Sequence, residues 1–170
     1  MYKCTLPEED GLTFSPVSFQ RQYRDRKRPV VLRSATSVSS ESFREQTRVS
    51  ALTMNWGHAN VTLSSANAFS YGRRKSLLSD YLSSMAAIDW SSPSDEVFYL
   101  FGEHGEELAG LLAQYNLPRF ATSLNLLAGA SCSAPAPALS FGVAADGSGV
   151  PFHFHNDGFS EVPLFHGLHR

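Results

Sequence analysis

The segment from residue 139 to residue 155 constrains the fold most. Its pattern predicts two short apolar strands separated by a glycine turn. Residues 139–143 and 150–155 carry the apolar side chains, and Gly147-Ser148-Gly149 lies between them. Glycine adopts positive φ at little cost, so this triplet favours a tight turn. Strands joined by such turns predict an all-β part that begins near residue 138.

The preceding sequence mixes helical and strand patterns without regular alternation. Ser15 and Pro16 predict a capped helix start, since serine supplies an N-cap oxygen and proline tolerates the first helical position. An irregular order of helices and strands favours an α+β fold over a doubly wound sheet. The other expected elements are strands at 29–32, 60–65 and 97–101, and helices from Glu41, over 77–85 and over 106–115.

The length of 170 residues suits one domain. Within it we expect an N-terminal helix and strand part over 1–120 and the first strands of the β part over 139–170. The residues between, 121–138, contain almost no charge and are rich in Ala, Ser, Leu and Pro. This composition is typical of a loop or an insertion.

Charge and hydropathy narrow the function classes. The net charge is −2, and acids and bases are mixed along the chain, which argues against nucleic acid as a partner. The basic stretch over 21–33 is interpreted as a helix end and a solvated loop, with an anionic partner as the alternative. No apolar run is long enough for a membrane span, and no signal peptide follows Met1. Taken alone, these features predict a cytosolic chain.

Two cysteines and one sequon leave the compartment open. Cys4 and Cys132 are too few for a disulfide framework or a zinc cluster, and either could be a free thiol or half of a disulfide. Asn60-Val61-Thr62 is a glycosylation sequon, which is usable only in a secretory compartment.

The residues with the clearest chemistry are His153 and His155. Successive side chains of a strand point to opposite faces, so these two imidazoles share one face. Two imidazoles in this arrangement can hold one metal ion, and imidazole suits iron, zinc, copper and nickel. The alternative is a pair of partly exposed strand histidines without a metal.

Two families have histidines in this pattern. General metal cupins have a glycine before His-x-His and a glutamate and a glycine after it, and here Gly147, Glu161 and Gly167 lie near those places. The chain resembles the JmjC family more closely, through Gly149-Val150-Pro151-Phe152-His153-Phe154-His155 and the landmarks Arg28-Pro29-Val30-Val31-Leu32 and Tyr99-Leu100-Phe101-Gly102. One similar member resides in the lumen of the endoplasmic reticulum and also has His-x-His.

The resemblance implies a cupin jelly roll, a protein partner, residence in that lumen, and Fe(II) and 2-oxoglutarate as cofactors. This chain departs from the pattern of the family at two positions. JmjC oxygenases have a carboxylate where this chain has His155, and Asp157 is a possible substitute. His169 stands where the family often has a lysine that binds the cosubstrate. Imidazole is shorter than that lysine and only partly charged at neutral pH.

These departures favour a degenerate, non-catalytic JmjC protein that acts through protein contacts. The alternatives are an Fe(II)- and 2-oxoglutarate-dependent protein hydroxylase and a metal cupin enzyme acting on a small molecule. No catalytic residue is assigned. The family's next strands, with a distal metal histidine, would follow Arg170, so we expect this chain to be a fragment that is poorly stable alone and inactive.

Overall fold

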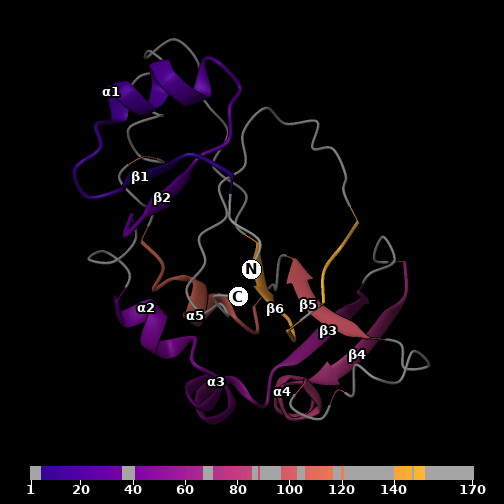
Figure 1. The fold of residues 1–170 in the computed structure, drawn as a ribbon. Coiled ribbons are helices and arrows are strands. Elements are labelled where there is room, and N and C mark those ends of the chain that lie inside the picture. The colour runs from indigo at the N-terminus through magenta and orange to yellow at the C-terminus, as the bar shows by residue number, and fades with distance from the viewer. Residues whose placement is uncertain are drawn as a thin grey trace. The chain divides into compact units, whose positions relative to one another are not determined.

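The computed structural model describes residues 5–35, 41–66, 71–85, 88, 97–102, 106–116, 120, 140–146 and 148–151 (Figure 1). The chain divides into two compact units. Unit 1 comprises Met1–Glu41, Tyr115–Ala136 and His169–Arg170, and unit 2 comprises Ser42–Gln114 and Pro137–Leu168. The described parts combine helices with an antiparallel sheet, which agrees with the α+β class.

Unit 1 contains a helix followed by a two-stranded parallel sheet. α1 (Pro16–Phe19) begins as predicted, because the Ser15 hydroxyl accepts a hydrogen bond from the backbone N–H of Ser18 at 3.0 Å. A π-helical turn, η1 (Gln20–Arg24), continues it and ends within the basic stretch. The strand expected at 29–32 is β2 (Val31–Arg33), and it pairs in parallel with β1 (Glu8–Asp10), which the sequence patterns did not predict.

The core of unit 1 is aromatic. The Phe19 ring meets the Phe120 ring edge-on, with 5.5 Å between centroids, and Phe14 meets Tyr23 in the same manner at 5.9 Å. Tyr23 is buried, and its hydroxyl donates to the Glu9 carboxylate at 2.6 Å. This hydrogen bond raises the pKa of Tyr23 and ties η1 to β1.

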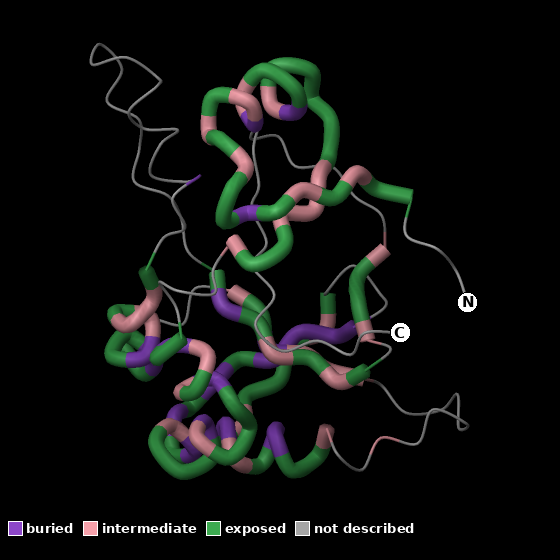
Figure 2. The backbone as a smooth tube through the Cα atoms, turned by 60° about the vertical axis from the view of Figure 1, so that its left-hand side comes forward, coloured by how far each residue is buried: buried purple, intermediate pink, exposed green. Residues whose placement is uncertain are grey.

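Unit 2 is built around a four-stranded antiparallel sheet. Leu63 and Leu100 lie directly opposite each other in its centre, and both side chains are completely buried. Exposed and buried residues alternate over residues 60–63 of the strand that carries Leu63. Buried residues are purple in Figure 2. Across the sheet the order is β4 (Arg73–Leu77), β3 (Asn60–Ser65), β5 (Phe98–Gly102) and β6 (Phe141–Val143).

The helices of unit 2 supply the rest of its core. α2 (Glu41–Gln46) and α3 (Val49–Trp56) precede the sheet, and α4 (Leu78–Met85) follows β4 directly. α3 and α4 lie against each other, and the Phe43 ring on α2 meets the Phe141 ring on β6 edge-on. The largest buried aliphatic and aromatic side chains on these helices are Phe43, Leu52, Leu78, Tyr81 and Leu82.

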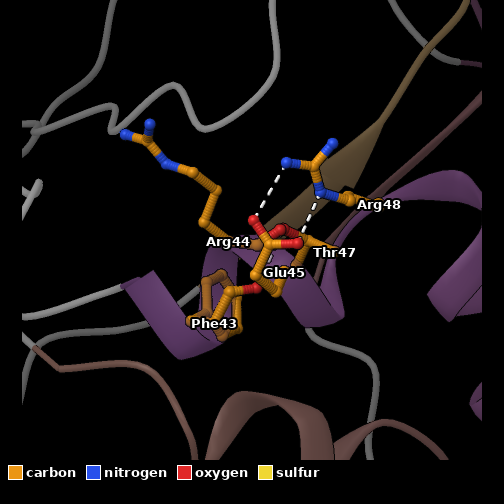
Figure 3. A network of polar contacts seen from close by, with 5 residues as sticks. All are labelled: Phe43, Arg44, Glu45, Thr47 and Arg48. Atoms are coloured by element: carbon orange, nitrogen blue, oxygen red, sulfur yellow. Dashed lines mark hydrogen bonds and ion pairs between the residues drawn. The ribbon is translucent and has the colours of Figure 1, made fainter.

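The break between α2 and α3 has a local cause, shown in Figure 3. The Thr47 hydroxyl lies 3.0 Å from the carbonyl oxygens of both Phe43 and Arg44, where it can donate to the last turn of α2. Arg48 adopts extended backbone and forms a two-bond ion pair with Glu45, with its shorter contact at 2.6 Å. The helix expected from Glu41 therefore begins as predicted but is followed by a second helix.

Several expected elements differ from the structure. The helix predicted over 106–115 is only α5 (Ala109–Leu112), because 106–108 form a turn and Leu108 offers no side-chain cap. β4 was not predicted, since Arg73, Arg74 and Lys75 lack an apolar alternation. The expected strand at 150–155 and the segment 121–138 fall almost wholly outside the described residues. None of the described helices has both the length and the apolar character needed to cross a membrane.

Replacing Leu100 by alanine tests the central contact. We expect Leu100→Ala to lower the free energy of unfolding by about 2–5 kcal/mol, because a fully buried leucine leaves a cavity. Leu77→Ala removes the same atoms from a side chain that is 39% exposed, so it should cost less than about 1 kcal/mol. Urea unfolding of both variants measures the difference, and equal losses would contradict the assigned register.

Candidate functional site

The two predicted metal ligands, His153 and His155, lie outside the described residues, so they stay predictions. The same holds for Asp157, Glu161 and His169, and for both cysteines. In the described ranges, no three His, Cys, Asp or Glu side chains come together as a metal site would require. What the structure does describe is the sheet and the turn that lead toward the histidine pair.

The described chain ends with a turn followed by Val150 and Pro151. The backbone N–H of Ser148 donates to the carbonyl of Ala145 at 3.1 Å, and the Ser148 hydroxyl donates to the same oxygen at 2.6 Å. These bonds close a turn between Ala145 and Ser148, which begins two residues before the predicted glycine triplet, and Gly147 lies outside the described residues. The turn follows β6, so the predicted histidine segment continues from a strand of the main sheet.

β6 is held in place by Tyr81 of α4. The Tyr81 hydroxyl donates to the carbonyl of Val143 at 2.8 Å, and the Phe98 carbonyl lies 3.4 Å away. Burial raises the pKa of Tyr81 to about 12, because the phenolate would lose its water in this environment. Tyr81 therefore remains a neutral hydrogen-bond donor at physiological pH and links α4 to the strand before the histidine pair.

One face of the sheet carries the core, and the other carries polar and aromatic side chains. Strand alternation places Ser64, Tyr99 and Arg73 together on the second face, because they are cross-strand neighbours in one row. The rings of Tyr99 and Phe101 stack with 6.2 Å between centroids, and Phe101 is 53% exposed. Sequence reasoning treated these residues only as parts of a strand, although their i, i+2 spacing indicated a shared face.

Gly142 allows the neighbouring strand to pass close beside this aromatic pair. Gly142 is the cross-strand neighbour of Phe101, and a Cβ atom at Gly142 would lie 3.0 Å from Phe101 Cδ2. Any larger residue would have to displace the Phe101 ring. The Phe141-Gly142-Val143 sequence thus combines two core-facing side chains with one position that leaves room for an aromatic ring.

The β4 edge of the sheet is basic. Arg73 and Lys75 lie on the same face as Tyr99, and Arg73 donates to the Ser64 hydroxyl. Arg74 lies on the core-side face, where its guanidinium carbon is 4.5 Å from the centre of the Phe98 ring. Such a cation–π contact stabilises the position of Arg74 by roughly 0.5–1 kcal/mol at an exposed site.

Removing the Tyr81 hydroxyl tests the link between α4 and β6. We expect Tyr81→Phe to lower the free energy of unfolding by about 1 kcal/mol, because the Val143 carbonyl loses a donor. The raised pKa means that the neutral phenol favours the folded state below pH about 10, and this contribution is lost as the pH rises through about 12.

The Tyr81 prediction is checked by urea unfolding between neutral and alkaline pH. Tyr81→Phe should unfold more easily at neutral pH and should lose the part of the alkaline destabilisation that Tyr81 causes. Ser83→Ala, on the exposed side of the same helix, is the control for a lost hydroxyl. A Tyr81→Phe protein as stable as the unsubstituted chain would contradict the proposed link.

The sequence was also compared with known proteins. No protein-family model matches the chain. JmjC domain-containing protein 8 of Homo sapiens is 35% identical over 162 residues, which cover 94% of this chain and 56% of the human protein. The proteins of the same name from Mus musculus and Rattus norvegicus are also 35% identical over 162 residues and are covered to 55%.

The chain thus spans little more than half the length of these relatives, while the similarity extends over nearly all of the chain itself. The matched 162 residues far exceed any single motif, so the agreement does not depend on the His-x-His pair. Similarity of this extent to the same protein in three mammals supports the assignment of this chain to the JmjC family.

Proposed function

We propose that this chain is part of a JmjC protein that acts through contacts with other proteins, without oxygenase turnover. The observation that carries the proposal is the identity of residue 155. A histidine stands where an oxygenase of this family needs a carboxylate, so an iron ion there would lack one negative ligand. A neutral ligand leaves the metal more positive and changes its redox behaviour.

A second residue supports the same conclusion. His169 occupies the place at which the family often has a lysine for the cosubstrate carboxylate. A lysine ammonium carries a full charge at neutral pH, whereas an imidazole is only partly protonated there. Both departures weaken the same reaction, one at the metal and the other at the cosubstrate.

The fold and the location belong to this proposal too. We propose that the described sheet is the beginning of a cupin jelly roll, in which 1–170 form part of one JmjC-like domain. His153 and His155 then share one face of a strand and are the residues that would hold a metal. Residence in the lumen of the endoplasmic reticulum is proposed from the resemblance, and the Asn60 sequon is consistent with it.

The second candidate function is an Fe(II)- and 2-oxoglutarate-dependent protein hydroxylase. The similarity to JmjC domain-containing protein 8 and the paired imidazoles favour it, because two imidazoles and one carboxylate are the ligands of a non-haem Fe(II) oxygenase. In this case iron would supply the oxygen chemistry, and the chain's residues would bind and orient the metal. Asp157 would have to provide the missing carboxylate.

Iron content and 2-oxoglutarate consumption distinguish these functions. The test uses a full-length protein that includes the strands expected after Arg170. Supplied with Fe(II), ascorbate and candidate protein substrates, it should consume no 2-oxoglutarate above a metal-free control. The variants to compare are His153→Ala, His155→Asp and His58→Ala. His58 is an exposed histidine in the turn before β3, so His58→Ala is a matched substitution away from the proposed site.

The results separate the two functions clearly. Iron-dependent consumption that is lost in His153→Ala and retained in His58→Ala would overturn the non-catalytic proposal and favour the hydroxylase. If the missing carboxylate is the reason for inactivity, His155→Asp should increase iron retention relative to the unsubstituted chain. Iron content measured by mass spectrometry provides that readout independently of activity.

A further inference from the structure

We propose that the edge of β4 with which no described strand pairs binds an extended peptide segment of a partner protein, with acidic residues at alternate positions, as an added strand of the unit 2 sheet. This inference rests on the proposed function for the existence of a protein partner. It adds the surface that such a partner would contact. The direction of the backbone groups of β4 and the charges beside them support this contact surface.

β4 is an edge strand of the described sheet. It pairs with β3, and no other described strand pairs with it. Four of its five residues are exposed, and Ser76 is half-buried. An edge strand presents a row of backbone N–H and C=O groups that can pair with another chain.

The register shows which backbone groups are available. The Ser65 N–H donates to the Gly72 carbonyl and the Leu78 N–H donates to the Ala59 carbonyl, both at 2.9 Å. Hydrogen-bonded pairs alternate along an antiparallel ladder, so Arg74 and Ser76 also direct their backbone groups toward β3. Arg73, Lys75 and Leu77 therefore direct theirs outward.

The same residues that offer outward backbone groups carry the charge. Arg73 and Lys75 are both exposed and lie on one face, two residues apart. In the described ranges neither has an ion pair with an acid, and the interaction of Arg73 is with the neutral Ser64 hydroxyl. A strand added beside β4 would place its own alternate side chains directly opposite these two cations.

The positive charge of Arg73 and Lys75 favours an acidic partner strand over a second copy of β4. Two copies of β4 cannot pair favourably edge to edge, because Arg73 and Lys75 of one copy would oppose those of the other. An acidic residue at each alternate position of a partner strand would instead form two opposite-charge cross-strand pairs. Main-chain hydrogen bonds then provide affinity and the alternate acidic side chains provide selectivity, as in other cases of strand addition.

The alternative interpretation is that Arg73 and Lys75 protect the edge of β4 from pairing with other chains. Lysine and arginine on an edge strand can simply prevent unwanted pairing with other chains. The two readings make different predictions about acidic strands, since protection predicts no register-dependent binding. A peptide experiment therefore decides between them.

The test uses the whole 170-residue chain and fluorescence anisotropy of labelled peptides about eight residues long, near the length of an ordinary strand. One peptide alternates glutamate with threonine or valine, and a second has the same composition with its glutamates grouped. Two further versions of the alternating peptide are N-methylated on one or the other set of alternate amides. N-methylation removes the backbone donors from one edge of the peptide only.

We expect the alternating peptide to bind at least about fivefold more tightly than the grouped one, because only alternation opposes both cations. One N-methylated version should lose binding and the other should retain it. Arg73→Thr with Lys75→Thr should weaken binding about tenfold while preserving strand propensity. The matched control, Arg26→Ser with Lys27→Asn in unit 1, removes the same charge and should bind normally; asparagine tolerates the positive φ of Lys27.

Absence of binding, equal binding of the alternating and grouped peptides, or equal effects of the two N-methylated versions would overturn the proposal. Equal weakening by the β4 and unit 1 variants would overturn it too, because that result indicates net charge alone. None of these outcomes depends on oxygenase activity. Turnover of 2-oxoglutarate by the same protein would overturn the non-catalytic function and leave the β4 surface in place.

Discussion

The contact between Leu63 and Leu100 fixes the arrangement of unit 2. The two side chains are cross-strand neighbours, and neither exposes any surface. A slip of one residue between β3 and β5 would move Leu100 to the polar face and bring Tyr99 and Phe101 into the core. The register between β3 and β5 therefore determines which side chains lie on the second face of the sheet. Arg73 and Lys75 lie on that face because β4 pairs with β3.

The sequence predicted the elements whose burial pattern is strong. β3 and β5 were expected within one residue of their bounds, because apolar and polar residues alternate in β3 and an apolar run forms β5. β1 and β4 were missed for the same physical reason. Glu8-Glu9-Asp10 and Arg73-Arg74-Lys75 bury little and are held by backbone pairing with a neighbouring strand, which sequence periodicity does not reveal. Tertiary partners, rather than local preference, make these segments strands.

For the candidate site, the sequence could predict the residue types and their chemistry but not the structure around them. The histidine pair and its shared face follow from residue type and strand alternation, and they stay predictions because those residues lie outside the described ranges. The surrounding structure contributes what the sequence could not provide. A tyrosine on α4 donates to a carbonyl on β6, 62 residues later, and no sequence pattern links two positions so far apart. This bond sets the position of the strand from which the histidine segment continues.

The aromatic core of unit 1 has a consequence for synthesis on the ribosome. Phe19 and Tyr23 pack with Phe120, so part of their burial requires a residue made roughly 100 positions later. At about 5–20 residues per second, these rings wait on the order of 5–20 s for their partner. During that interval the Phe19 and Tyr23 rings lack the Phe120 ring that covers them, and chaperones that bind exposed aromatic side chains have time to reach them. Completion of this core is therefore a late event, even though most of its residues emerge early.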